Sequence, residues 1–416
     1  MEHKHYTSKQ TLLLVYNFNR SDFLSYFRVC KADFIFFFAE FASPDEVFNR
    51  QFAEYGQAIF WGNFKNAFDL LEKIKPDKVL FLYIESYFHM ALNIACKVKG
   101  IPTFLLDHGI QDSHVHKILK AFTSPQKRIP KNQLLFTKLK QIPARIKARQ
   151  YLINTINILP PKPSKALRIY CSYRKKEHYI SVLKKLEKQI YYPDAYISIS
   201  PVVASAQKKL LGFSFSRTHY FGIPTFDHLV NLSASHTPAK NLIFIDQGLA
   251  TAGFLGWTSA IFESFTQSFA AICLEHGYRV FVKKHPRQPN KDWGRLAEEK
   301  KVIVIDDDTL ANLLPTTKII VGFFSTYLLP LIAMEHTTVL TLENHPVGNL
   351  NVSKSFIEAG VAQPVYNLQE LEWALEHINM LHQQQMFNKA KFTREWLYKF
   401  DGKSGERLRE ILLQEK

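Results

Sequence analysis

Short uninterrupted apolar runs alternate with amphipathic stretches along most of the chain. The first 107 residues contain five such runs, at 11–18, 33–40, 57–62, 78–85 and 103–107. They are rich in Val, Ile, Leu and Phe and lack polar alternation, which is typical of strands covered on both faces. Residues 66–75 and 86–100 have helical spacing, and the second stretch ends at Gly100, as helices often do. The pattern predicts a parallel sheet flanked by helices.

The same alternation returns after a long basic segment. Strands are predicted at 167–173, 194–200 and 218–222, with one helix near 179–189 and another that begins at Pro201. Ser200 is a suitable N-cap for the second helix, and proline is favoured in the first turn. Residues 223–238 are polar and lack periodicity, so we predict the linker between two domains there.

A second α/β unit follows this linker. Its strands are predicted at 241–248, 278–286, 301–307, 318–324 and 338–343, and its helices at 258–277, 309–316, 326–336 and from a cap at Asn367. Each strand leads into a loop with polar residues at its carboxyl end. Ligands of open α/β sheets bind at that edge.

The 416 residues are too many for one ordinary core and suit two or three domains. We therefore predict an α/β fold with two Rossmann-like domains that face a central cleft. The first domain is expected at 1–230 and the second at 238–390, followed by a C-terminal helix at 391–416.

Positive charge is concentrated in one insertion of the first domain, at about 113–176. This stretch holds sixteen Lys and Arg residues and no Asp or Glu, which equals the net charge of +16 for the whole chain. Apolar residues are interleaved with the cations. Such a segment is either a solvated basic face or a surface for an anionic partner. We expect contact with the inner-membrane surface through 117–149 and, without a recognisable motif, no nucleic acid partner.

The composition also bears on the compartment. The four cysteines are far apart and form no CxxC pair, which favours free thiols in a reducing compartment. The amino terminus offers an apolar run of about six residues, too short for a signal peptide, and no segment supplies the roughly 20 apolar residues of a membrane span. We expect a cytoplasmic protein that could also bind peripherally to the inner membrane.

Two motifs in the second unit suit phosphate binding. A predicted strand delivers Lys284, His285 and Pro286 to the carboxyl edge, where imidazole and ammonium groups can donate hydrogen bonds to phosphate oxygens. Another strand leads into Ser325 and Thr326 just before an apolar helix, where hydroxyls and the helix dipole favour an anion. The alternatives are structural: a surface turn for the first motif and a plain helix cap for the second.

Two further loops carry candidate chemistry. The strand at 103–107 ends in Asp107-His108-Gly109, and either side chain could deprotonate an acceptor hydroxyl, although the aspartate could equally cap the next turn. Gln247 and Gly248 lie in a strand-to-helix loop of the kind that contacts nucleotides, or in an ordinary turn. No recognised ligand spacing supports a metal site.

Taken together, the motifs resemble those of bacterial sialyltransferases and polysialyltransferases. The pattern of that group is a D/E-D/E-G motif, an HP motif and an S-S/T motif, and Asp107-His108-Gly109, His285-Pro286 and Ser325-Thr326 stand in those places. His108 departs from the pattern. A His-Gly pair after a strand is similar instead to CDP-glycerol glycerophosphotransferases of teichoic acid synthesis.

The resemblance implies a GT-B fold and a metal-independent, inverting glycosyltransferase without a cofactor. The donor would be a CMP-linked acidic sugar such as sialic acid, and the acceptor a glycan or glycolipid of a capsule or lipooligosaccharide. His285, Ser325 and Thr326 would bind the nucleotide phosphate, with Asp107 as base and His108 as its rival. A CDP-alditol phosphotransferase and a non-catalytic, polyanion-binding GT-B-like protein are the alternatives.

Overall fold

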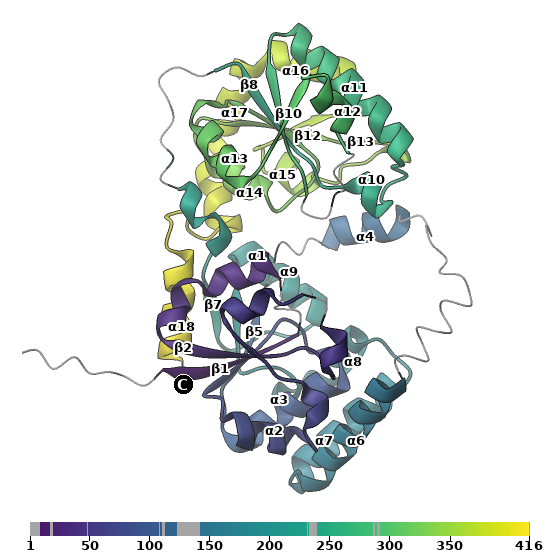
Figure 1. Cartoon of the computed structure of the whole chain (residues 1–416), viewed down its shortest axis with the longest axis vertical. Coiled ribbons are helices and arrows are strands. Elements are labelled where there is room, and N and C mark those ends of the chain that lie inside the picture. The colour runs from purple at the N-terminus through teal and green to yellow at the C-terminus, as the bar shows by residue number, and fades with distance from the viewer. Residues whose placement is uncertain are drawn as a thin grey trace, which may run out of the picture. The chain divides into compact units, whose positions relative to one another are not determined.

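The computed structural model describes residues 9–16, 20–47, 49–107, 109, 113–122, 142–230, 232, 239–285, 288 and 292–415. They form two compact units (Figure 1). Unit 1 comprises residues 1–109, 129–227 and 403–416, and unit 2 comprises residues 110–128 and 228–402. Within the described residues, none of the helices is long and apolar enough to cross a lipid bilayer.

Unit 1 is built on a seven-stranded sheet in the order β3-β2-β1-β4-β5-β6-β7, and every pair of neighbours is parallel. Its strands are β1 Gln10–Val15, β2 Phe34–Ala39, β3 Gly56–Ala58, β4 Lys78–Phe81, β5 Thr103–Leu106, β6 Ala195–Ser198 and β7 Thr218–Tyr220. Its α-helices are α1 Ser21–Leu24, α2 Ala67–Ile74, α3 Tyr87–Lys99, α6 Ile142–Ile158, α7 Pro161–Arg174, α8 Tyr179–Leu186, α9 Pro201–Leu211 and α18 Ser404–Gln414. The central strands β1, β4 and β5 are almost entirely buried, as their apolar runs predict.

Unit 2 is built on a six-stranded parallel sheet in the order β10-β9-β8-β11-β12-β15, with helices on both sides (Figure 1). Its strands are β8 Asn241–Ile245, β9 Arg279–Lys283, β10 Val302–Ile305, β11 Ile319–Gly322, β12 Thr338–Leu342 and β15 Gln363–Val365, with a small hairpin of β13 Asn344–His345 and β14 Gly348–Asn349. Its α-helices are α4 Ser113–Phe122, α10 Leu249–Ala252, α11 Ser259–Glu275, α12 Gly294–Glu298, α13 Asp307–Leu313, α14 Leu328–Ala333, α15 Lys354–Glu358, α16 Leu368–Glu376 and α17 Ile378–Trp396.

Short 3₁₀ helices connect several of these elements. They are η1 Ser25–Phe27, η2 Val29–Ala32, η3 Pro44–Glu46, η4 Gln51–Glu54, η5 Trp61–Asn63, η6 Gln189–Tyr191, η7 Pro224–Leu229 and η8 Leu314–Thr316.

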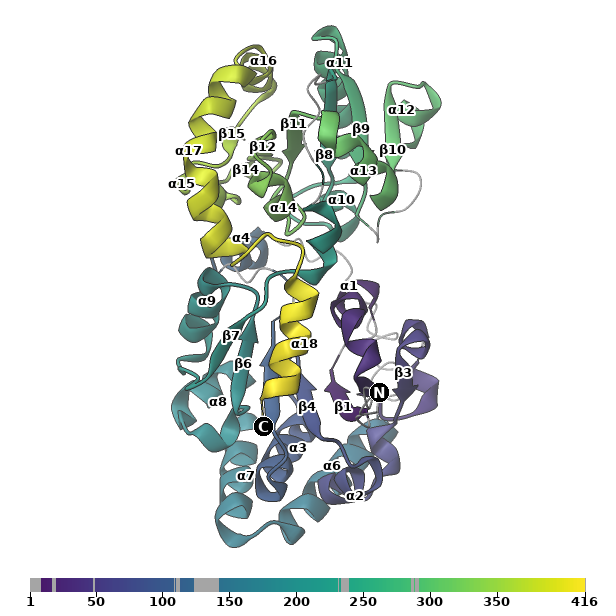
Figure 2. The same ribbon diagram turned by 90° about the vertical axis from the view of Figure 1, so that its left-hand side faces the viewer.

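The chain passes between the units more than once. Helix α4 lies in unit 2, where His114 Nε2 is 2.8 Å from the backbone oxygen of Asn351 and the backbone N–H of Leu255 donates to Phe122. Helix α18 lies in unit 1 (Figure 2), where the Arg409 guanidinium pairs with the Asp33 carboxylate. The described residues 113–122 and 142–176 of the predicted basic insertion thus belong to different units.

Most predicted elements are present, and the capping residues act as expected. Ser200 accepts a hydrogen bond from the backbone N–H of Val203, and Asn367 accepts one from Glu370. Gly100 ends α3 in the left-handed region, with φ of 70°. Residues 17 and 18 of the first predicted strand and most of 231–238 in the predicted linker lie outside the described residues.

The predicted strand at 167–173 is wrong, because these residues form the second half of α7. Leu167 and Tyr170 are buried, whereas Arg168 and Ser172 are exposed, so the burial repeats every three to four residues as in a helix. Pro161 is the first residue of α7, so the helix has already begun before the apolar run at 167–173. A short apolar run alone does not separate a strand from a buried helical face.

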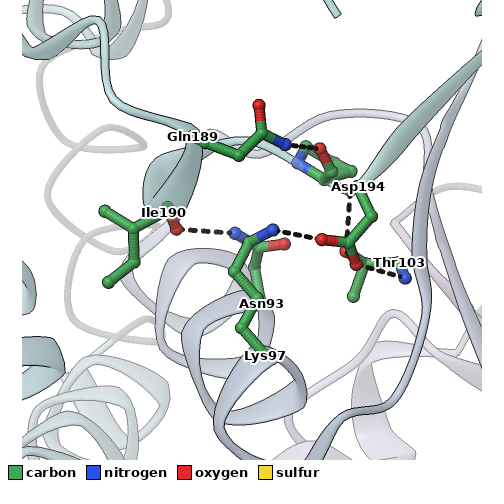
Figure 3. Close-up of polar contacts among 7 residues, drawn as sticks. Asn93, Lys97, Thr103, Gln189, Ile190 and Asp194 are labelled. Atoms are coloured by element: carbon green, nitrogen blue, oxygen red, sulfur yellow. Dashed lines mark hydrogen bonds and ion pairs between the residues drawn. The ribbon is translucent and has the colours of Figure 1, made fainter. Parts of the chain in front are cut away.

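A polar cluster around Asp194 holds the starts of two neighbouring strands together (Figure 3). The Asp194 carboxylate accepts hydrogen bonds from Lys97 Nζ at 2.6 Å, from Thr103 Oγ1 at 2.7 Å and from the Thr103 backbone N–H at 3.0 Å. Thr103 begins β5, and Asp194 directly precedes β6. Although burial raises the pKa of Asp194, the bonds from Lys97 and Thr103 outweigh it and hold the pKa below its ordinary value.

We expect Asp194→Ala to lower the free energy of unfolding of unit 1 by about 1–3 kcal/mol near neutral pH, since it removes a hydrogen-bonded, partly buried charge. Because the folded-state pKa is lowered, this stabilisation exists above the ordinary carboxyl pKa and disappears as the pH falls through the folded-state value. Urea unfolding at neutral and acidic pH measures the effect. The exposed Asp45→Ala is the control, and an equal loss in both variants would contradict the assignment.

Candidate functional site

The carboxyl edge of the unit 2 sheet brings three candidate segments into one row. In the register of the sheet, Ile245 at the end of β8 is paired with Lys283 of β9 on one side and Gly322 of β11 on the other. The segments that carry Gln247, His285 and Ser325 therefore leave the sheet side by side. Gly322 is needed for this approach, because a Cβ there would lie 2.8 Å from the backbone oxygen of Ile245.

A buried carboxylate, Asp246, fixes the first two of these segments. It accepts hydrogen bonds from the backbone N–H of Gly248 at 2.9 Å, from Gln288 Nε2 at 2.7 Å and from Trp293 Nε1 at 2.7 Å. Burial raises its pKa, and the three donors limit the rise. The amide oxygen of Gln288 in turn accepts from the backbone N–H of His285 at 2.6 Å. Gln288 thus connects the Asp246 carboxylate to the backbone of His285.

Gly248 lies directly against this cluster. Its φ is 70°, a conformation that glycine adopts at little cost. A Cβ at this position would be 3.0 Å from Cγ of Gln288 and 3.6 Å from Cβ of His285. The loop with Gln247 and Gly248 and the loop with Lys284 and His285, predicted as separate nucleotide contacts, are therefore neighbours.

A second set of contacts ties β9 to the serine-threonine segment. Lys283 Nζ lies 3.2 Å from Oδ1 of Asp307, and the Tyr327 hydroxyl donates to the same oxygen at 2.6 Å. Ser325 and Thr326 are half-buried and directly precede Tyr327. The Ser325 hydroxyl accepts a hydrogen bond from the Tyr327 backbone N–H at 3.2 Å, within the turn that precedes α14.

Asp107 is placed at the end of β5 in unit 1, where it is buried. Its carboxylate accepts hydrogen bonds from the Tyr196 hydroxyl at 2.6 Å, the Ser198 hydroxyl at 2.5 Å and the backbone N–H of Ile199 at 3.3 Å. All three donors come from β6 and the residue after it. Burial raises the pKa of Asp107 to about 6, and the bonds from Ser198, Tyr196 and Ile199 limit the rise. A carboxylate with such a pKa can hold or release a proton near neutral pH.

Two predicted site residues, His108 and Pro286, lie outside the described residues. Within the described ranges, His, Cys, Asp and Glu side chains do not gather into groups of three or more that could hold a metal ion.

The sequence prediction missed Gln288, Trp293 and Glu343 as parts of the unit 2 edge. Glu343 follows β12 and accepts hydrogen bonds from the backbone N–H groups of Val352 and Ser353. Burial raises its pKa to about 7. Its position after an apolar strand was a usable signal for this residue. A glutamine two residues after a His-Pro pair has no sequence pattern that distinguishes it from a surface residue.

The comparisons with known proteins agree on the fold. A model of the family described as Alpha-2,8-polysialyltransferase (POLYST) matches residues 65–344. The structure is similar to the glycotransferase of kitacinnamycin, at 11% identity and a TM-score of 0.50 over 98% of both chains. It is similar to the calicheamicin glycosyltransferase CalG4, at 11% identity and a TM-score of 0.51 over 98% of this chain and 100% of that one.

The wall teichoic acid polymerase TagF is also similar, at 9% identity and a TM-score of 0.50 over 98% of this chain and 88% of that one. No curated protein sequence matches the chain. These structural likenesses show the fold alone, and they confirm the predicted α/β fold of GT-B type.

The pKa of Asp107 leads to a specific pH dependence of stability. Because the folded-state pKa of about 6 exceeds the ordinary value of 3.8, the folded protein binds the proton more tightly. Stability should therefore fall as the pH rises between these values, by about 3 kcal/mol at most. Asp107→Asn should remove this part of the pH dependence.

Urea unfolding of Asp107→Asn, of the unaltered protein and of the exposed Asp45→Asn at several pH values between about 4 and 7 tests this expectation. If the two variants have the same pH profile, the carboxylate of Asp107 ionises as easily in the folded protein as in the unfolded chain.

Proposed function

This chain belongs to the alpha-2,8-polysialyltransferase family and is a glycosyltransferase, and we propose that it transfers an acidic sugar, such as sialic acid, from a CMP donor to a bacterial surface glycan. The observation that supports this proposal most is the meeting of Gly248, His285 and the Ser325 segment at one edge of the unit 2 sheet. A nucleotide phosphate requires several donors that converge on one place.

The chemistry of a CMP leaving group fits these residues. As the bond from the sugar to the phosphate breaks, negative charge develops on the phosphate oxygens. Lys284 and His285 would stabilise this charge, and the hydroxyls of Ser325 and Thr326 would donate hydrogen bonds to it. Gln247 and Gly248 would contact the nucleotide. With these groups the departing phosphate needs no metal ion, and we propose metal-independent transfer with inversion at the sugar carbon.

The acceptor hydroxyl must lose a proton, and we assign this step to the Asp107-His108 pair. The three hydrogen bonds on Asp107 favour a division of labour in which its carboxylate anchors the end of β5 and His108 receives the proton. A His-Gly pair in this place is also the feature shared with CDP-alditol phosphotransferases, which makes a CDP-linked donor the second candidate.

The proposed partners are a nucleotide-sugar donor and a glycan or glycolipid acceptor. A growing lipid-linked glycan would bring the enzyme to the inner face of the cytoplasmic membrane. The basic segment 117–149 is predicted to contact that surface. Its residues 123–141 lie outside the described residues.

We expect His285→Ala to lower the rate of sugar transfer by orders of magnitude, because the leaving phosphate loses a donor in the transition state. Transfer assays with CMP-sialic acid and a polysaccharide acceptor measure the rate, and circular dichroism checks the fold. The exposed His377→Ala in the same unit is the matched control. Near-normal transfer by His285→Ala would remove the donor-site assignment.

Thermal denaturation with CMP, CDP, UDP or GDP identifies the donor class independently of turnover, because a bound nucleotide stabilises the folded state by mass action. We expect the largest increase in melting temperature with CMP and a smaller increase in His285→Ala. A larger effect of CDP would favour the phosphotransferase, and no effect of any nucleotide would contradict the site.

Substitutions at the Asp107-His108 pair separate its two roles. His108→Ala should lower kcat by roughly two or more orders of magnitude, within the range of general base catalysis, and leave the CMP-induced thermal shift unchanged. Asp107→Asn should keep the hydrogen bond from Ile199 and retain much of the activity. The reverse ranking of the two variants in kcat would make Asp107 the base.

A further inference from the structure

Helix α6 has an inner, buried face and an outer, exposed face. The inner face belongs to the core of unit 1, where Tyr151 and Thr155 are buried and the Thr155 hydroxyl accepts a hydrogen bond from the backbone N–H of Ala67 at the start of α2. On its outer face the side chains of Ile142, Ile146 and Ile153 are 44%, 52% and 44% exposed. Positions three or four residues apart lie on the same face of a helix, so residues 142, 146, 149 and 153 form one stripe along α6.

Cations accompany this stripe. Arg149 takes the remaining position in it, and both Arg149 and Arg145 are exposed. Helix α7 packs beside α6 (Figures 1 and 2) and repeats the charge on its own exposed side with Lys162, Lys165 and Arg168. No Asp or Glu occurs between residues 113 and 176. We call the exposed sides of α6 and α7 together, from residue 142 to residue 168, the hairpin face.

We propose that the hairpin face binds a lipid surface that contains anionic headgroups, with α6 lying in the plane of the interface. The isoleucines would enter the boundary between headgroups and acyl chains, and the arginines and lysines would contact the headgroup phosphates. Long basic side chains suit this depth, since their aliphatic parts can remain in the apolar layer.

The exposed isoleucines distinguish a lipid surface from a soluble anionic partner. A soluble polyanion, such as a nucleic acid or an acidic glycan, would use the cations and leave the exposed isoleucines in water. A lipid surface satisfies both kinds of residue at once. A second copy of the same face would cover the isoleucines but would bring two sets of cations together, which disfavours self-association.

The inference rests on the membrane location in the proposed function, for which it names the contact surface, and it does not depend on the donor site. If it holds, the enzyme would meet a lipid-linked acceptor along the membrane surface. The hairpin face is part of unit 1, whereas the proposed nucleotide site is formed by residues of unit 2, so each can fail without the other.

The test uses the full chain and sedimentation with vesicles of phosphatidylcholine, with and without phosphatidylglycerol. Ile146→Ser/Ile153→Ser should weaken binding to the anionic vesicles by roughly tenfold or more, because the apolar part of the contact is lost. The matched control is Ile261→Ser/Ile303→Ser, which removes two similarly exposed isoleucines of unit 2 and should bind as the unaltered protein does.

A charge variant completes the test. Lys162→Gln/Lys165→Gln/Arg168→Gln should lose the preference for phosphatidylglycerol and the sensitivity to salt. All variants should keep the circular dichroism of the unaltered protein and its CMP-induced thermal shift.

Two results would overturn the proposal. In the first, Ile146→Ser/Ile153→Ser binds anionic vesicles as well as the unaltered protein does while the charge variant does not, which would make the hairpin face a site for soluble polyanions. In the second, light scattering shows an oligomer that Ile146→Ser/Ile153→Ser dissociates, which would make it an interface between copies of the chain.

Discussion

In a sheet whose strands all run in one direction, every strand ends at the same edge, and this constraint determines where the candidate chemistry of each unit can lie. The pairing of Ile245 with both Lys283 and Gly322 sets the register of three adjacent strand ends in unit 2. The loops that follow need no long excursion to meet, because the ladder of backbone hydrogen bonds has already aligned them. The neighbourhood of Gly248 and His285 is a direct result of this alignment.

Each unit also buries a carboxylate just past the end of a central strand, Asp107 in unit 1 and Asp246 in unit 2. Burial raises the pKa of both carboxyl groups. In each case three hydrogen-bond donors partly compensate for the loss of water. The cost of removing a charge from water is offset only when such donors are fixed. These carboxylates therefore hold the strand ends and the following loops in defined positions, which is the requirement for a preorganised site.

The sequence allowed most of the fold to be predicted, since buried parallel strands leave apolar runs and helices leave caps such as Ser200 and Asn367. Residues 167–173 show the limit, because a short buried helical face and a buried strand have the same composition. The position of a candidate residue in the fold was predictable where its motif directly follows a strand, as with His285 after β9. The contact of Gln288 with Asp246 was not, because a hydrogen bond between residues 42 positions apart depends on the folded register.

The path of the chain through the two units bears on the order in which the protein forms during translation. Helix α18 completes unit 1 through Arg409 and Asp33 but follows every residue of unit 2. Helix α4, which belongs to unit 2, is synthesised after residues 1–109 of unit 1 and before its residues 129–227. Neither unit can therefore finish as an independent block in amino-to-carboxyl order, the usual route of multidomain chains. The surface of unit 1 that α18 covers therefore remains exposed during translation until the whole of unit 2 has been synthesised.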